Sequence, residues 1–154
     1  VWLLAGARRL SPAVAEVVRQ AAETNQVFVS AITPWEIAML VAKNKLMFAC
    51  DVRTWLDEAL SRPGITLAPI IPAIAVDSVL LPGFPHGDPA DRMIVATARR
   101  LRAILVTADA KLLTYGRGGH VAVLDTSSIH APTERPDIPN HSTGKTEHEA
   151  VPPE

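Results

Sequence analysis

The sequence predicts one α/β domain with a doubly wound, mostly parallel sheet flanked by helices. Helical patterns alternate with short apolar runs along the chain, which is typical of strand–helix–strand units around a parallel sheet. A chain of 154 residues suits a single domain. Hydrophobic residues make up 48% of the chain and are mostly aliphatic, as expected for strands that are buried on both faces.

The first helix and strand follow from local signals. Ser11 and Pro12 are typical of an N-cap and a first helical residue, and the apolar residues after them recur at helical spacing. Residues 27–31 form a β-branched and aromatic run, which predicts a strand. A second helix then opens at residues 33–36 and reaches about Lys45.

The middle of the chain repeats this order. Asp51 suits the N-cap of a helix over 51–60, and the Pro-Gly pair at 63–64 stops that helix. A short strand over 65–68 and a short helix from Pro72 follow. We therefore expect another strand–helix unit of the same sheet.

The last part of the domain begins with a loop over 82–87. Asp88 and Pro89 then open a strongly patterned helix that reaches Leu101. The remaining elements are a strand, a short helix and a final strand, over 104–107, 111–115 and 121–124. We expect the domain to end near residue 126, because residues 127–154 contain five prolines and few apolar residues, which predicts a disordered tail.

Charge and cysteine content restrict the partners and the compartment. The formal net charge is -1, so RNA binding would require a local basic patch. The single Cys50 excludes an internal disulfide and favours the reducing cytoplasm. No apolar run reaches the roughly 18 residues that span a bilayer, and no signal peptide opens the sequence. We expect a cytoplasmic protein without a membrane segment.

Three acidic residues occupy similar places in the predicted fold. Glu36 and Asp91 lie near the starts of helices, and Asp109 follows a strand directly. The loops after the carboxyl ends of parallel strands meet at one edge of a sheet, where ligands bind. A structural explanation exists for each: a Thr33–Glu36 capping box, first-turn stabilisation of the helix that Asp88 caps, and a turn or cap at Asp109.

The convergence of these acids would favour a metal ion. Two carboxylates about 4 Å apart repel by about 4 kcal/mol at an effective dielectric constant near 20. A hard cation such as Mg²⁺ or Mn²⁺ offsets that repulsion and supports hydrolysis of a phosphodiester. Arg92 and Lys111 are the basic residues nearest the acids, so we expect them to bind substrate phosphates. The sequence has no Gly-rich phosphate loop, zinc-spaced Cys/His set or nucleophile elbow.

Three segments, in this order and at these spacings, resemble the PIN-domain ribonucleases of the VapC toxin type: VSAITPWEI (29–37), HGDPADRMIVATA (86–98) and LVTAD (105–109). The resemblance covers residues 1 to about 126. It implies a PIN-like sheet, an Mg²⁺ or Mn²⁺ site and endonucleolytic cleavage of RNA. It also implies a homodimer and a cognate antitoxin, as in a type II toxin–antitoxin system.

The resemblance also assigns roles to individual residues. It implies that the catalytic acids and metal ligands are Glu36, Asp91 and Asp109, that Asp88 is an additional ligand, and that Thr107 is a supporting hydroxyl. The family opens with a strand that ends in aspartate, whereas residues 1–6 resemble the helix just after it. We therefore expect an N-terminally truncated domain that lacks the opening central strand and the first catalytic aspartate. A degenerate, non-catalytic PIN module that binds RNA or an antitoxin is the alternative.

Overall fold

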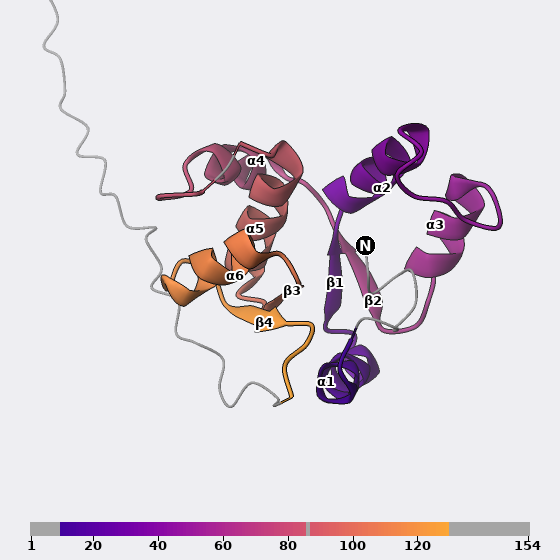
Figure 1. Ribbon diagram of the computed structural model, residues 1–154, viewed down its shortest axis with the longest axis horizontal. Coiled ribbons are helices and arrows are strands. Elements are labelled where there is room, and N and C mark those ends of the chain that lie inside the picture. The colour runs from indigo at the N-terminus through magenta and orange to yellow at the C-terminus, as the bar shows by residue number, and fades with distance from the viewer. Residues whose placement is uncertain (1–9, 86, 130–154) are drawn as a thin grey trace, which may run out of the picture.

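Helices and parallel strands alternate through residues 10–85 and 87–129, the part of the chain that the computed structural model describes (Figure 1). This order confirms the predicted α/β class. The elements are α1 (Pro12–Glu23), β1 (Val27–Ser30), α2 (Ile32–Ala42), α3 (Val52–Leu60), β2 (Ile65–Ala68), α4 (Pro72–Val79), α5 (Pro89–Leu101), β3 (Leu105–Thr107), α6 (Ala110–Arg117) and β4 (Val123–Asp125).

Side-chain oxygens mark the starts of α1 and α3, as predicted. The hydroxyl of Ser11 accepts a hydrogen bond from the Val14 amide at 3.2 Å. Asp51 Oδ1 accepts one from the Arg53 amide at 2.9 Å. Each bond satisfies an amide that has no partner inside its own helix, so the predicted caps are confirmed.

The start of α2 differs from the prediction. The helix begins at Ile32, and its N-cap is Ala31, which has no side-chain hydrogen bond to offer. Thr33 therefore lies inside the helix, and the interpretation of Thr33 and Glu36 as a capping box is wrong. Pro34 is the third helical residue, a position whose amide has no intrahelical partner to lose.

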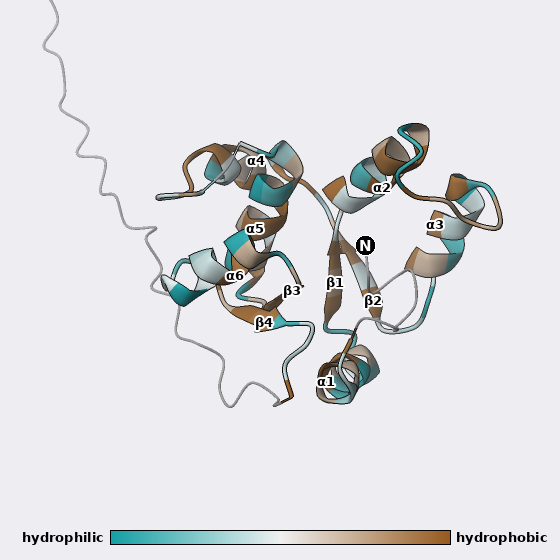
Figure 2. Cartoon of the chain, viewed as in Figure 1, coloured by the Kyte–Doolittle hydropathy of each residue, from teal (hydrophilic) through white to brown (hydrophobic). Residues whose placement is uncertain are grey.

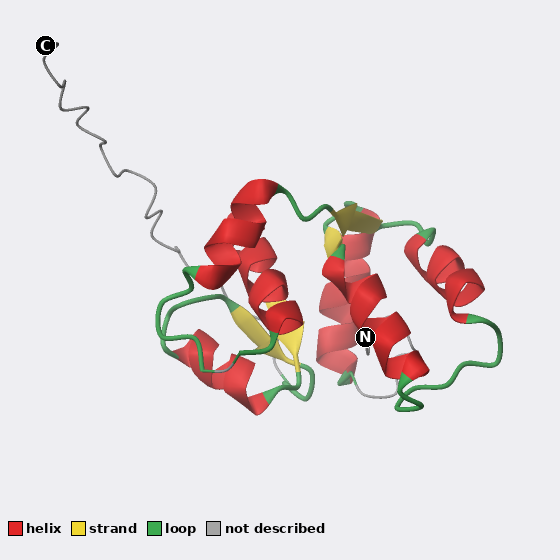
Figure 3. Ribbon diagram, turned by 90° about the horizontal axis from the view of Figure 1, so that it is seen from above, coloured by secondary structure: helices red, strands yellow, loops and turns green. Residues whose placement is uncertain are grey.

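The four strands form two separate parallel pairs. β1 pairs with β2 and β3 with β4, in the registers Val27↔Ile65 and Leu105↔Val123. Figures 1 and 3 show β1 and β2 turned away from the direction of β3 and β4, and no strand within the described residues joins β1 to β3. The last strand begins at Val123, two residues later than predicted. The Leu105 amide donates to the Ala122 carbonyl, and the paired residues of the ladder begin with Leu105 and Val123.

The two strand pairs belong to two halves of the molecule. The β1–β2 half (residues 11–68) has a core around Val29, Ile37 and Ala59, against which the side chains of α3 pack. The β3–β4 half (residues 72–125) has a core that includes Val95 and Leu112. Figure 2 shows β1 and most of β4 as hydrophobic, whereas the helices carry both hydrophobic and hydrophilic residues.

Helix α5 joins the two halves. Its buried Val95 belongs to the core of the β3–β4 half. Thr97, two residues further on, lies within 3.2 Å of the buried Ser30 hydroxyl at the end of β1. Because the Thr97 hydroxyl donates to the Met93 carbonyl at 2.7 Å, the proton between the two hydroxyls comes from Ser30.

The end of the domain packs against its beginning. The Ser11 amide donates to the Thr126 carbonyl at 2.8 Å, and the Ser11 hydroxyl donates to the Ser128 carbonyl. Most of the predicted tail, residues 130–154, lies outside the described residues. Among the helices that are described, none combines the length and apolar character needed to cross a bilayer.

Candidate active site

Two carboxylates lie at the start of α5. Asp88 is the N-cap, and its Oδ1 accepts hydrogen bonds from the Ala90 amide at 2.9 Å and the Asp91 amide at 3.4 Å. Asp91 is the acidic residue of the first turn, where the helix dipole favours negative charge. The structural explanation for Asp88 is thus confirmed. The cap uses one oxygen of Asp88, however, and leaves Oδ2 free of any hydrogen bond within the described residues.

Asp109 occupies the same position at the start of α6. Its Oδ1 accepts from the amides of Lys111 at 2.7 Å and Leu112 at 3.1 Å. The buried Thr107 fixes the backbone between β3 and α6, because its hydroxyl accepts a hydrogen bond from the Asp109 amide at 3.0 Å. Thr107 therefore helps to place Asp109, and Asp109 places one exposed carboxylate at the end of β3.

Glu36 differs from the aspartates because it caps nothing. It lies in the second turn of α2, partly buried, and its side chain has no hydrogen bond or ion pair within residues 10–85 and 87–129. Burial raises the pKa of the Glu36 carboxyl, and the negative charge of Asp88 raises that pKa further. Glu36 and the start of α5 are therefore close enough to interact electrostatically.

The structure brings Glu36 toward Asp88, with Asp91 one turn along the same helix. Asp109 stands on a different helix, α6. In the part of the chain that the structure describes, no three His, Cys, Asp or Glu side chains come close enough to hold one metal ion together. The donor set is all carboxylate oxygen, which suits Mg²⁺ or Mn²⁺, and Mg²⁺ commonly takes one or two carboxylates together with waters and substrate phosphates. The described residues fit that looser arrangement.

The two basic residues predicted near the acids have different surroundings. The Arg92 guanidinium donates to the Ser78 carbonyl at 3.1 Å and lies 5.2 Å from the centre of the Phe84 ring. It thereby ties α5 to the end of α4. The Lys111 ammonium has no ion pair within the described residues, so Lys111 is the better placed of the two to meet a phosphate.

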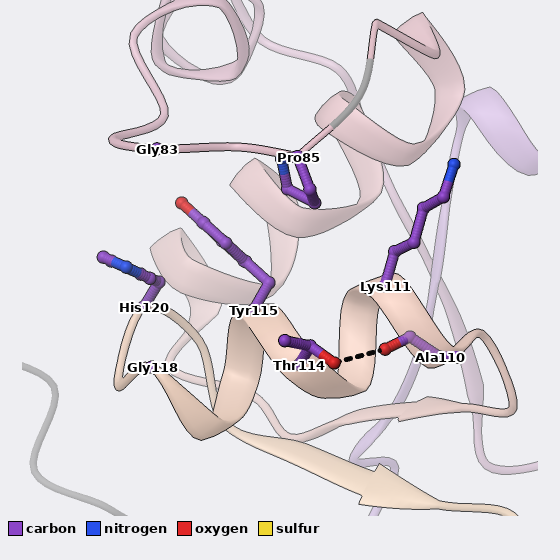
Figure 4. Close-up of a pocket in the computed structure, with 8 residues that line it drawn as sticks. All are labelled: Gly83, Pro85, Ala110, Lys111, Thr114, Tyr115, Gly118 and His120. Atoms are coloured by element: carbon purple, nitrogen blue, oxygen red, sulfur yellow. Dashed lines mark hydrogen bonds between the residues drawn. The ribbon is translucent and has the colours of Figure 1, made fainter.

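A pocket of about 450 Å³ is lined by residues of α6, of the loop after α6 and of the loop before α5. Figure 4 shows it between the loop with Gly83 and Pro85 and the face of α6 that carries Lys111 and Tyr115. Sequence reasoning did not find this pocket, because its walls come from segments that are about 30 residues apart. It also missed Asp125, which pairs with Thr107 across β3 and β4 and whose carboxylate accepts from the Ser127 amide at 2.8 Å.

Comparison with known proteins identifies the family of the chain. The PIN domain family matches residues 1–118, about three quarters of the chain. The chain belongs to the PIN-domain family. This PIN domain is also 34% identical over 114 residues to Ribonuclease VapC22 of Mycobacterium tuberculosis (strain ATCC 25618 / H37Rv), and the match spans 74% of the chain and 84% of that protein. The resemblance to VapC-type PIN ribonucleases that the three motifs predicted is thereby confirmed.

Proposed function

We propose that this PIN domain is the toxin of a toxin–antitoxin pair and acts as an endoribonuclease that depends on Mg²⁺ or Mn²⁺. The observation that carries the proposal is that α2, which holds the partly buried Glu36, packs against α5, whose start carries Asp88 and Asp91. A desolvated carboxylate beside another carboxylate is costly unless a positive charge joins them. Similarity to a protein named ribonuclease supports RNA as the substrate.

In this proposal Glu36, Asp91 and Asp109 supply oxygen ligands, directly or through water, and Asp88 contributes its second oxygen at the rim. When bound, a divalent cation activates water and stabilises the leaving oxygen of a phosphodiester. Thr107 acts as a positioning residue through the Asp109 amide. Lys111 binds a substrate phosphate, and Arg92 contributes mainly by holding α5 against α4.

The test is RNA cleavage by the full chain, in Mg²⁺, in Mn²⁺ and in EDTA. We expect Glu36→Gln, Asp91→Asn and Asp109→Asn each to slow cleavage by about 100-fold or more, because a lost or misplaced ligand disturbs the reacting centre. Asn at position 109 preserves the helix cap. The matched control is Asp57→Asn, which changes an exposed acid on the outer helix α3 and should leave cleavage unchanged.

Full cleavage in EDTA, or full activity of Glu36→Gln, would contradict the proposal. The alternative is a degenerate PIN module that binds RNA or an antitoxin without cutting. It predicts a folded protein that binds RNA and shows no metal-dependent cleavage under any of these conditions.

The proposed protein partners are a cognate antitoxin and a second copy of the chain. Family membership supports both, and the exposed aliphatic side chains at the end of α4 and just after it (Val76, Val79 and Leu80) supply apolar surface for a homodimer. Sedimentation should give the mass of a dimer. A strictly monomeric protein at micromolar concentration would contradict the homodimer.

A further inference from the structure

The pocket beside Asp109 has the size of a small-ligand site. Its volume of about 450 Å³ lies within the range of roughly 300–1,000 Å³ that is usual for such sites. One side is the loop of Gly83 and Pro85, and the other is the exposed face of α6 (Figure 4). Among the described residues that line it, none is acidic. An anionic ligand would therefore meet no negatively charged side chain among these residues.

One end of the pocket carries an aromatic stack that is firmly held. The Tyr115 hydroxyl donates to the Pro82 carbonyl at 3.0 Å, and Phe84 meets the Tyr115 ring edge-on, with centroids 5.0 Å apart. The partly exposed His120 ring stacks on the Tyr115 ring at 4.5 Å, with 18° between their planes. Gly118 leaves space for this ring, because a Cβ there would lie 3.1 Å from Cδ2 of His120.

The other end of the pocket carries a positive charge. Lys111 rises from the first turn of α6, and Figure 4 shows its side chain extending away from Tyr115 and His120 along the Pro85 side. Thr114, between the two ends, is already engaged, because its hydroxyl donates to the Ala110 carbonyl at 2.8 Å and accepts from Arg117 at 2.9 Å. Aromatic planes and a lysine thus offer the main attractive contacts.

The pocket is continuous with the acidic site through the chain itself. Asp109 immediately precedes Ala110 and Lys111, which line the pocket, and Pro85 lies three residues before Asp88. The Lys111 end of the pocket is therefore the end nearest to Asp109 along the chain.

We propose that this pocket binds one nucleotide of the RNA substrate, with the base against the His120–Tyr115 stack and the adjacent phosphate at Lys111. The assignment rests on the proposed function, which places RNA cleavage at the neighbouring acids. Every base has a π face that can stack on an aromatic side chain, and a lysine near the backbone adds a phosphate contact. The pocket would hold the nucleotide beside the cleaved bond and so contribute to the choice of cleavage site.

The experiment measures binding without chemistry. The full chain, in EDTA, is titrated against a fluorescent single-stranded hexaribonucleotide, and Kd is read from fluorescence anisotropy. We expect His120→Ala to raise Kd by about 5- to 150-fold, the usual effect of losing one stacked base. His120→Phe should retain most of the binding, because it keeps an aromatic plane. Lys111→Gln should raise Kd more than Lys45→Gln, which removes the same charge from the exposed loop after α2.

Two results would overturn the proposal. One is a Kd for His120→Ala equal to that of the unchanged protein, with both proteins folded by thermal unfolding. The other is an equal loss for His120→Phe and His120→Ala, which would mean that stacking is not the interaction. If cleavage persists while Kd is insensitive to the pocket, only the pocket assignment fails. If the protein neither binds nor cleaves RNA, the proposed function fails with it.

Discussion

The two halves of the molecule hold their acidic residues in different ways. In the β3–β4 half, Asp88 and Asp109 are exposed N-caps whose charge stabilises the helices that they start. In the β1–β2 half, Glu36 is partly buried, caps nothing, and has a pKa that burial raises. A fold that only needed stable helices would keep the two aspartates and replace the glutamate. The difference supports the proposed role of Glu36 in the acidic site.

The largest expected effect tests whether the halves form one cooperative unit. Ile37→Ala empties the core of the β1–β2 half, and Leu112→Ala does the same in the β3–β4 half, since both side chains are almost completely buried. Each should lower the free energy of unfolding by about 2–5 kcal/mol. Met47→Ala, at an exposed position between α2 and α3, is the control and should change it by less than about 0.5 kcal/mol.

Chemical denaturation of the two core variants, followed by circular dichroism and by tryptophan fluorescence, gives these values. Because α5 contacts both halves, the two probes should report one transition in each variant. Two separated transitions would show that α5 does not couple the halves.

The caps give the next largest effect. Asp109→Ala should cost about 0.5–2 kcal/mol of stability, because the amides of Lys111 and Leu112 lose their acceptor. Asp109→Asn should recover most of that loss, whereas Glu36→Gln should cost nothing. Thermal unfolding of the three variants measures the contrast. A loss of stability for Glu36→Gln as large as that for Asp109→Ala would show that Glu36 stabilises the fold as much as a capping aspartate does.

The hydrogen bond between the halves should have a similar or smaller effect. Ser30→Ala removes the donor to the Thr97 hydroxyl and should cost about 0.5–1.5 kcal/mol. Ser61→Ala, at an exposed hydroxyl after α3, is the matched control. If the two substitutions have equal effects on the denaturation midpoint, the buried contact at Ser30 contributes nothing to stability.

The smallest effect is the pH dependence that Glu36 introduces. Its pKa is raised in the folded state, so its contribution to stability is complete below the ordinary value of 4.5 and declines as pH rises through the folded-state value. In EDTA, Glu36→Gln should therefore gain stability relative to the unchanged protein as the pH rises from 4.5. A difference in stability between the two proteins that stays constant across pH 4–7 would show that the glutamate is not desolvated.

The sequence predicted the parts of the fold that local chemistry controls. Ser11, Asp51 and Asp88 were assigned as caps because a short polar side chain before a helix has few other structural uses. The predicted start of α2 was wrong because its N-cap, Ala31, makes no side-chain hydrogen bond to the helix, so no local sequence signal marks the start. The separation of the strands into two pairs depends on long-range packing and has no local signal.

For the candidate site, too, the sequence predicted only what local patterns show. The motifs identified the acids one by one, but the contrast between capping aspartates and a desolvated glutamate depends on how α2 packs against α5. His120 was missed because a histidine after two glycines has no distinguishing pattern until Tyr115 stacks against it. Features formed by two segments that are distant in the sequence can be recognised only in the structure.

The most direct test of the central claim is thermal unfolding of the unchanged protein and Glu36→Gln, each in EDTA and in Mn²⁺, with Asp57→Asn as the control. A ligand that binds the folded state raises its stability by mass action. We expect Mn²⁺ to raise the Tm of the unchanged protein and of Asp57→Asn by several degrees. Glu36→Gln should be at least as stable in EDTA and should respond little to Mn²⁺. An equal Mn²⁺ response in Glu36→Gln, or no response in the unchanged protein, would contradict the assignment of Glu36 to a metal site.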